Sequence, residues 1–265
     1  MVNLQNIEIN LSKNAFDNAK SYFDKSKKAK GKLESLHSAI KTTENKIASI
    51  GQVKPTITIT NRSVNRKNQE WYARFHYFFT SQGKLVIAGR NATDNQNIYS
   101  KYLEKTDMFF HADITGASAV VLKNGSNASE SELLQTAQFA ASYSRAWKIS
   151  VQSVDVYCVK KEAVSRSSHG EYVSRGGFMI KGGRKWFRNT KLGLAINLKS
   201  KENLEIVPIE TSLLKTEGKW LKIRPGNIQN LEMAQQIHKN MEHQETILQT
   251  NIESEIPGPS EIIKD

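Results

Sequence analysis

Residues 71–90 read WYARFHYFFTSQGKLVIAGR, which is the pattern of a β-hairpin. Two runs rich in aromatic and β-branched residues, 75–80 and 84–89, flank the turn residues Ser81-Gln82-Gly83. We expect further strands at 107–112, 117–123, 153–160, 177–181, 192–198 and 204–209, and helices at 94–103, 130–147 and 227–242. Because strands, a long helix and more strands follow one another with little βαβ alternation, the sequence predicts an α+β fold with a mostly antiparallel or mixed sheet and a packed helix.

A long helical pattern precedes the hairpin. From Ser12, a plausible N-cap, to residue 50 no proline occurs, and apolar or small residues recur at alternating steps of three and four. This is the period of a coiled coil, whose apolar stripe needs a partner. We therefore divide the chain into a coiled-coil arm (1–50), a linker (51–69), a central domain (70–200), and a strand and helix extension with an acidic tail (201–265).

The charge distribution points to an anionic partner. The net charge is +12, and basic residues outnumber acidic ones 13 to 6 in residues 1–70 and 18 to 9 in residues 71–200. In residues 201–265 the acidic residues lead, 11 to 7. A basic body with an acidic tail favours nucleic acid over a solvated surface that only aids solubility.

Composition excludes several classes of protein. A single cysteine, Cys158, lies in an apolar run, so we expect a small buried side chain and no disulfide within the chain. No apolar run approaches the ~20 residues needed to cross a bilayer, and the N-terminus lacks the pattern of a secretory leader. We expect a soluble, cytoplasmic protein without a membrane association.

Two sets of residues are candidates for binding phosphate. Arg90 and Asn95 lie where a hairpin strand passes into a helix, so a guanidinium and helix N-terminal amides can meet a phosphate there. The alternative is that Arg90 pairs with a local carboxylate such as Asp94 and that Asn95 is only a cap. Residues 160–191 form the second set, with nine basic and two acidic residues, paired glycines and interleaved aromatic residues. The alternative there is a hairpin with a solvated basic rim.

The sequence His111-Ala112-Asp113 invites a catalytic interpretation, with Ser118 supplying a hydroxyl. No nucleophile elbow and no second histidine at ligand spacing accompany it. We therefore expect a structural His111–Asp113 hydrogen bond that supports the turn at Gly116, and we expect neither catalysis nor a metal or cofactor. Tyr143 and Trp147 lie one helical turn apart, which favours core packing over stacking on RNA.

Taken together, these motifs resemble the NFACT-R domain of the NEMF/RqcH ribosome quality-control family. The resemblance rests on residues 71–75 and 85–90, on the HAD and GAS segments (111–113 and 116–118), on the segment 143–147, and on Gly177 to Gly182. Residues 9–12 and 18–23 resemble the arm that leads into that domain, and 256–258 resemble a family tail. Departures are Asn91 for the usual Asp, Gln96 for Glu and Arg166 for Lys.

The resemblance implies an RNA-binding component of ribosome-associated quality control. Its expected partners are tRNA and rRNA of stalled large ribosomal subunits, with support for mRNA-independent C-terminal tailing. The chain does not show the family's NFACT-N and helix-hairpin-helix regions, so one expectation is a split factor that meets a separate NFACT-N chain through the coiled coil. The alternatives are a stand-alone nucleic-acid adaptor and a small hydrolase using His111, Asp113 and Ser118. The residues expected to bind RNA are Arg90, Asn95, Lys123, Arg166, Arg175, Lys181, Arg184, Lys185 and Arg188. The residues expected to maintain the motifs are Gly89, His111, Asp113, Gly116, Trp147, Gly177 and Gly182.

Overall fold

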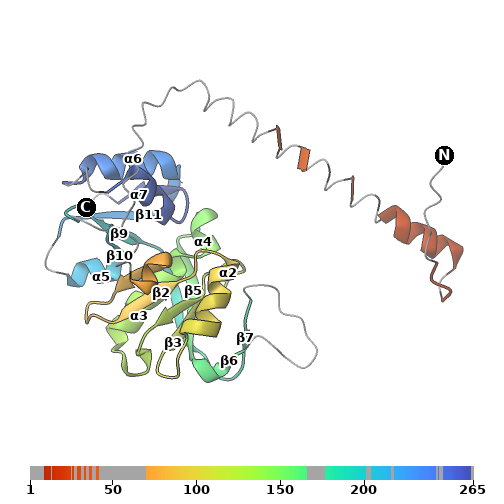
Figure 1. Ribbon diagram of the computed structural model, residues 1–265, viewed down its shortest axis with the longest axis horizontal. Helices are drawn as coiled ribbons and strands as arrows, with labels where there is room; N and C mark the ends of the chain where they lie inside the picture. The colour runs from red at the N-terminus through yellow and green to blue at the C-terminus, as the bar shows by residue number, and fades with distance from the viewer. Residues whose placement is uncertain are drawn as a thin grey trace. The chain divides into compact units, whose positions relative to one another are not determined.

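The computed structural model forms two compact units, residues 1–64 and 65–265. It describes residues 9–12 and 14–24, single positions of the same helix up to residue 41, and residues 70–165, 177–200, 204–215, 218–242, 244 and 247–263. The second unit, called the body below, contains every element labelled in Figure 1. The predicted domain boundary at residue 200 falls inside it.

In the first unit, residues 15–24 are helical, and so are the later described positions up to residue 41. Leu33, Leu36 and Ile40, three residues of the predicted apolar stripe, are each more than half exposed. The earlier described positions of that stripe, Ala19, Tyr22, Ser26 and Ala29, are exposed as well. Its last positions, Thr43, Ile47 and Ile50, and the predicted linker at 51–69 lie outside the described residues, so the coiled coil stays a prediction.

A six-stranded sheet forms the centre of the body, in the order β1-β2-β4-β3-β5-β8. Its strands are β1 (His76–Phe79), β2 (Leu85–Ala88), β3 (Met108–Ala112), β4 (Val120–Leu122), β5 (Ser153–Lys160) and β8 (Lys185–Lys191). All neighbouring strands are antiparallel. The predicted α+β class with a mostly antiparallel sheet is therefore confirmed.

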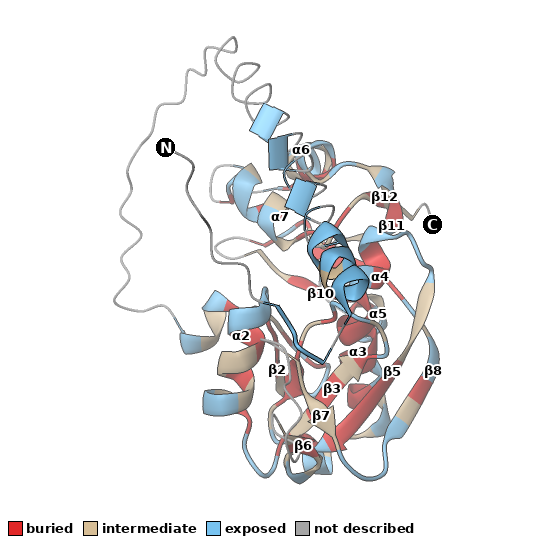
Figure 2. Ribbon diagram, turned by 90° about the vertical axis from the view of Figure 1, so that its right-hand side faces the viewer, coloured by how far each residue is buried: buried red, intermediate tan, exposed pale blue. Residues whose placement is uncertain are grey.

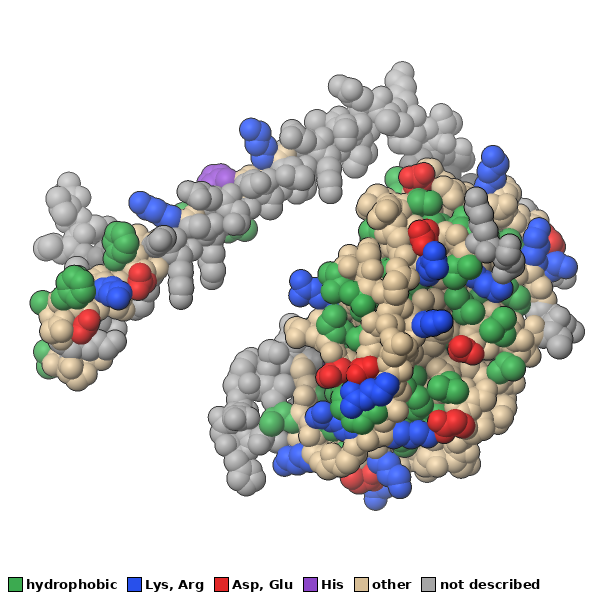
Figure 3. Space-filling view, turned by 180° about the vertical axis from the view of Figure 1, so that it is seen from behind, with side chains coloured by type: hydrophobic (Ala, Val, Ile, Leu, Met, Phe, Trp, Pro, Cys, Tyr) green, Lys and Arg blue, Asp and Glu red, His purple; other side chains and the backbone are tan. Residues whose placement is uncertain are grey.

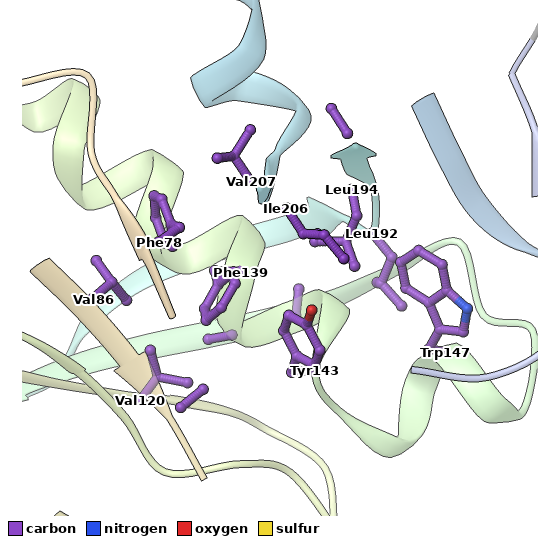
Figure 4. Close-up of a cluster of buried hydrophobic side chains, with 14 of the residues drawn as sticks. Phe78, Val86, Val120, Phe139, Tyr143, Trp147, Leu192, Leu194, Ile206 and Val207 are labelled. Atoms are coloured by element: carbon purple, nitrogen blue, oxygen red, sulfur yellow. The ribbon is translucent and has the colours of Figure 1, made fainter. Parts of the chain in front are cut away.

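Helix α3 (Glu130–Ser142) covers one face of this sheet. It begins at a capping box, in which the Ser129 side chain accepts a hydrogen bond from the Glu132 amide and Glu132 accepts one from the Ser129 amide. Its buried side includes Leu133, Ala137 and Phe139, which belong to one core cluster with Phe78 and Val120 of the sheet. Figure 4 shows Phe139 on the same side as Phe78 and Val120. The helix ends at Tyr143, because Ser144 caps a separate short helix, α4 (Arg145–Lys148), so the predicted helix 130–147 is two helices.

A second segment covers the opposite face. It consists of the 3-10 turn η2 (Trp71–Arg74), helix α2 (Ala92–Asn97) and the π-helical turn η3 (Ile98–Tyr102). Phe75, Ile98 and Leu103 from this segment pack with Ile87 and Phe109 of the sheet in a second core cluster. With both faces covered, β3 and β5 are largely buried, whereas β8 at the sheet edge is mostly exposed (Figure 2).

A four-stranded sheet, in the order β10-β9-β11-β12, packs against the other side of α3. Its strands are β9 (Leu194–Asn197), β10 (Ile206–Pro208), β11 (Trp220–Ile228) and β12 (Ser260–Ile262). Helices α5 (Ile209–Leu214), α6 (Asn230–Asn240) and α7 (Gln249–Glu255) lie in the same part of the body as this sheet. The short pair β6 (Val164–Ser165) and β7 (Met179–Ile180) lies outside both sheets, as do the 3-10 turns η4 (Gly125–Asn127) and η5 (Lys161–Ala163).

The C-terminal region differs most from expectation. Residues 247–263 were expected to belong to a polar tail, but Ile252, Ile256 and Ser260 are buried in the body. Strand β12 pairs with β11, and this pairing supplies the burial that the local composition does not predict. The predicted helix 227–242 is shorter, because residues up to 228 extend β11.

Candidate nucleic-acid interface

Gly89 and Asn95 form a buried contact that shapes the turn after β2. A Cβ at Gly89 would lie 2.1 Å from Asn95 Oδ1, so only glycine fits this position. Asn95 Oδ1 accepts a hydrogen bond from the Ala119 amide at 3.0 Å. The cap of α2 is Asn91, whose side chain accepts from the Asp94 amide. The structure thus gives Asn95 a packing role, and its buried side chain does not offer the phosphate contact that we expected.

Arg90 makes its ion pair with a residue far along the chain. Its guanidinium donates to the carbonyls of Arg74 and Phe75 and to Glu255 of α7. The expected local partner, Asp94, pairs with Arg74 instead, at 3.1 Å. Glu255 also hydrogen-bonds His76 Nδ1, at 2.6 Å. The Glu255 carboxylate therefore bonds both the Arg90 guanidinium and the His76 ring.

The protonation states of this pair follow from their surroundings. Burial, opposed by the Glu255 hydrogen bond, lowers the pKa of His76 below its ordinary value. Burial alone would raise the pKa of Glu255, but the hydrogen bond from His76 and the charge of Arg90 lower it overall. At neutral pH we therefore assign a carboxylate at Glu255 and a neutral ring at His76.

A pocket of about 700 Å³ opens beside this pair. We call it the motif pocket, because four separated motifs line it: His76 with Gly89-Arg90, Gly116 with Ser118, Tyr143 to Arg145 with Lys148, and Ser254 with Ile256-Pro257. Gly116 has a φ of +88°, and a Cβ there would lie 3.4 Å from Arg145 Cβ. The predicted motif glycines thus bring backbone close to basic side chains here.

Arg145 and Lys148 line the motif pocket with exposed side chains. Neither forms an ion pair with any residue in the described part of the chain. Our sequence interpretation missed both, although Arg145 stands inside the YSRAW motif, because the helical spacing there indicated only core packing.

That core packing is present for the aromatic pair. Trp147 is fully buried and Tyr143 nearly so. The Tyr143 hydroxyl donates to the Glu255 carbonyl at 3.0 Å, and the Trp147 indole nitrogen donates to the Pro259 carbonyl at 3.1 Å. Both rings therefore attach the C-terminal segment to α3 and α4 and present no face for stacking on a base.

His111 does not make the hydrogen bond that we expected. Its Nδ1 is buried without a hydrogen-bond partner, and its ring packs beside those of Phe109 and Tyr157. Asp113 is held through its backbone amide, which donates to the Asp155 carbonyl at 2.8 Å. The Ser118 hydroxyl donates to the Gly89 carbonyl at 2.6 Å. The turn at Gly116 is thus supported by backbone bonds and Ser118 rather than by a His–Asp pair.

The second basic surface lies along the edge strand β8 and the turn before it. We call it the basic edge and define it by the exposed residues Lys181, Arg184, Lys185 and Arg188. The Arg188 guanidinium lies 4.0 Å from the Trp186 ring centre and pairs with Asp155. Arg184 lies 4.8 Å from the Tyr157 ring centre, and Lys185 pairs with Glu130. Basic side chains also gather, with acidic ones among them, at one end of the face of the body seen in Figure 3.

Glycines and a smaller pocket adjoin the basic edge. Gly177 precedes β7, and Gly182 forms the turn after it with a φ of +85°. A pocket of about 500 Å³ lies here, lined by Lys160, Lys181 and Lys185 among others. Cys158 also lines it, and burial raises the pKa of its thiol to about 11, so the thiol stays protonated at neutral pH.

Three further residues were expected to contact RNA, and the structure describes one of them. Lys123 donates to Asp107 at 2.6 Å and to the Tyr102 carbonyl at 2.8 Å, which places it in a largely buried structural network. Arg166 and Arg175 lie outside the described residues. Their roles in RNA binding, like that of Lys123, stay predictions.

Residues 74–182 match the family model described as the NFACT protein RNA binding domain. The chain therefore carries an NFACT RNA-binding domain. The match includes the β1–β2 hairpin, α3, most of the motif pocket and Lys181 of the basic edge. It ends before β8 and before the C-terminal segment that completes the motif pocket.

Relatives that share the NFACT domain are ribosome quality control proteins by name. The archaeal Rqc2 homolog aRqcH of Methanocaldococcus jannaschii is 40% identical over 61% of this chain and 25% of its own length. The ribosome quality control complex subunit NEMF homolog of Drosophila melanogaster is 32% identical over 72% of this chain and 20% of its own length. The chain thus spans a quarter or less of the length of these two relatives. The C-terminal part of the fibronectin/fibrinogen-binding protein from Streptococcus suis superposes with a TM-score of 0.39 at 21% identity, over 66% of this chain and 76% of that chain.

Within the described ranges, no group of three or more His, Cys, Asp or Glu side chains is arranged to hold a metal ion. Among the helices described, none combines the length and the apolar character that a membrane crossing requires.

Proposed function

We propose that this chain binds RNA in ribosome-associated quality control, contacting tRNA or rRNA on stalled large ribosomal subunits in the cytoplasm. The observation that carries the proposal is a match to the NFACT RNA-binding domain over residues 74–182, followed directly by the edge strand β8, which presents exposed basic side chains beside aromatic ones. Phosphate contacts from such side chains supply affinity without reading sequence. Relatives with ribosome quality control names support the same setting.

The basic edge is tested by removing three of its charges. The variant K181A/R184A/K185A should weaken binding of purified tRNA and reduce the slope of log K against log salt by up to about 3, since each lost phosphate contact removes up to roughly 0.9. Fluorescence anisotropy at several salt concentrations measures both quantities. The control K101A/K199A/K239A removes three exposed lysines that have no ion pair within the described residues. Equal slopes for the two variants would place the RNA contact elsewhere.

We propose that the chain itself makes and breaks no covalent bond. In the alternative hydrolase, the Ser118 hydroxyl would pass its proton to a base, but it donates that proton to the Gly89 carbonyl. His111 packs beside the rings of Phe109 and Tyr157 and has a pKa lowered chiefly by burial. Saturable hydrolysis that H111A abolishes without unfolding the protein would contradict this proposal.

We also propose that the N-terminal helix pairs with a helix of a separate chain, which in the split-factor interpretation carries NFACT-N. The exposed side chains of Leu33, Leu36 and Ile40 motivate this, since burial of each would contribute roughly 1.5–3 kcal/mol before association costs. The variant L36D/I40D should lose such a partner in co-purification, whereas K20A/K41A should retain it. A wild-type chain that recovers no NFACT-N protein from cells would favour a stand-alone RNA-binding adaptor.

A further inference from the structure

The motif pocket has a charge balance that suits an anion. Arg90, Arg145 and Lys148 line it, and the nearby carboxylate Glu255 already pairs with Arg90 and hydrogen-bonds His76. Arg145 and Lys148 are left without an acidic partner among the described residues. Two such cations on one short helix beside a concave surface favour a bound phosphate group.

The hydroxyl groups of the pocket indicate which class of ligand it can bind. Ser118 donates its proton to the Gly89 carbonyl at 2.6 Å, and Ser254 donates to the Asn251 carbonyl at 2.8 Å. Each hydroxyl therefore keeps lone pairs for accepting a hydrogen bond and has no proton left to donate. A phosphodiester group, which only accepts, gains nothing from these oxygens. A ribose hydroxyl, which can donate, does.

The motif pocket is large enough for a ligand bigger than a phosphate group. Its volume of about 700 Å³ lies within the roughly 300–1,000 Å³ typical of pockets for small organic ligands. We infer that the motif pocket is a second RNA contact of this protein, one that holds a single-stranded ribonucleotide unit with its phosphate against Arg145 and Lys148 and its ribose toward Ser118 and Ser254. This inference rests on the proposed RNA-binding function and assigns it a site apart from the basic edge.

The test uses the full chain and a fluorescein-labelled single-stranded RNA nonamer, with anisotropy as the readout. The variant R145A/K148A should weaken binding on the order of tenfold and make the salt slope shallower by about 1.4, because two contacts at roughly 0.7 each are lost on a single strand. The matched control K101A/K105A removes two exposed lysines that line neither pocket and should bind like wild type. Equal affinities of the two variants would overturn the inference.

Competitors and DNA identify the ligand class. A DNA nonamer of the same sequence should bind wild type more weakly than RNA, and the difference should shrink in R145A/K148A. Adenosine monophosphate should compete better than inorganic phosphate at equal concentration. Inorganic phosphate that competes equally well would reduce the pocket to a simple anion site and overturn the ribose assignment.

A variant that should strengthen RNA binding provides a second test in case R145A/K148A misfolds. E255Q removes the carboxylate that neutralises Arg90, so it should bind RNA more tightly than E232Q, which removes an exposed charge away from the pocket. If R145A/K148A fails to fold, this comparison decides: equal or weaker binding by E255Q overturns the inference. A wild-type chain that binds neither tRNA nor the nonamer defeats the proposed function itself. Loss of binding only in K181A/R184A/K185A defeats this pocket alone.

Discussion

At the scale of single residues, the interface depends on close contacts between motifs that are short and separated. Gly89 has room for no side chain because Asn95 occupies the space, and the Asn95 side chain in turn hydrogen-bonds the Ala119 amide. Glycine is needed here because Asn95 lies so close to the Gly89 backbone. The backbone conformation does not require it, since the φ of Gly89 is not positive. Two motifs are thereby joined by one buried amide group.

This contact predicts different costs for two glycine substitutions. Gly89→Ala should destabilise the protein by about 1–3 kcal/mol, because Asn95 must move and a buried hydrogen bond is lost. Gly183→Ala should be nearly neutral, since nothing lies within 4 Å of an added Cβ and its φ is not positive. Chemical denaturation with urea measures both. Equal midpoints would contradict the assigned role of Asn95.

The His76–Glu255 pair predicts how stability depends on pH. The folded pKa of His76 is below 6.5, so the unfolded chain binds the proton more tightly, and stability falls as the pH drops through about 6.5. Glu255, whose pKa is also lowered, adds a further loss below its ordinary value of 4.5. The thermal midpoint of wild type should therefore drop more between pH 7.5 and 5.5 than that of His76→Asn, which keeps a donor but does not titrate. Parallel pH profiles would refute this reading of the pair.

At the scale of elements, a buried carboxylate near the start of α3 links this helix to the β1–β2 hairpin. Glu132 is fully buried and accepts hydrogen bonds from the Thr80 hydroxyl and the Lys84 ammonium group, each at 2.9 Å. It also accepts from the Ser129 amide at 3.0 Å. Burial alone would raise the pKa of Glu132, but these donors lower it, so the group is a carboxylate at neutral pH.

Removing this carboxylate should be costly. Glu132→Ala should destabilise the protein by about 3 kcal/mol, near the lower end for breaking a buried pair, because the Lys84 side chain keeps some access to water. Ser129→Ala should cost about 1 kcal/mol as a lost N-cap. Glu130→Ala removes only an exposed pair with Lys185 and should cost less than about 1 kcal/mol. Urea unfolding ranks the three, and a Glu132→Ala effect no larger than that of Glu130→Ala would be inconsistent with the described network.

At the scale of the body, the C-terminal segment packs against the region that matches the NFACT family, although the match itself ends at residue 182. Ile252 and Ile256 are buried, and the Trp147 indole reaches the Pro259 carbonyl and the Ser260 hydroxyl. The same segment provides Glu255 and one wall of the motif pocket. The segment therefore contributes both to the hydrophobic core and to the wall of the motif pocket.

Truncation after residue 244 should therefore unfold or strongly destabilise the body. The loss exposes apolar surface around Trp147 and leaves the edge of β11 unpaired. Trp147→Phe, which removes only the two hydrogen bonds and some volume, should cost about 1–3 kcal/mol. Calorimetry of both proteins measures the difference. A truncated chain that melts within a few degrees of wild type would show that the segment is dispensable.

The properties that could be predicted from the sequence are local ones. Alternation and turn residues predicted the β1–β2 hairpin and the full extent of β5, and the helical pattern predicted the start of α3 at residue 130. The helical spacing of Tyr143 and Trp147 predicted core packing, and the order of the motifs indicated the NFACT domain. These properties depend on residues near one another in the chain, whose period and caps are visible in the sequence.

Contacts between residues far apart in the chain could not be predicted, because they depend on how the elements pack. Glu255 lies 165 positions after Arg90, and no local pattern distinguishes it from other acidic residues of the C-terminal region. Arg145 and Lys148 face a pocket because α4 begins where α3 ends, close to the turn at Gly116. Lys123 is satisfied by Asp107 because β3 and β4 are neighbours in the sheet. Periodicity specifies which side of an element is apolar, but the pairing of elements depends on the packing of the whole body, and with it which charges are neutralised and which stay without an acidic partner.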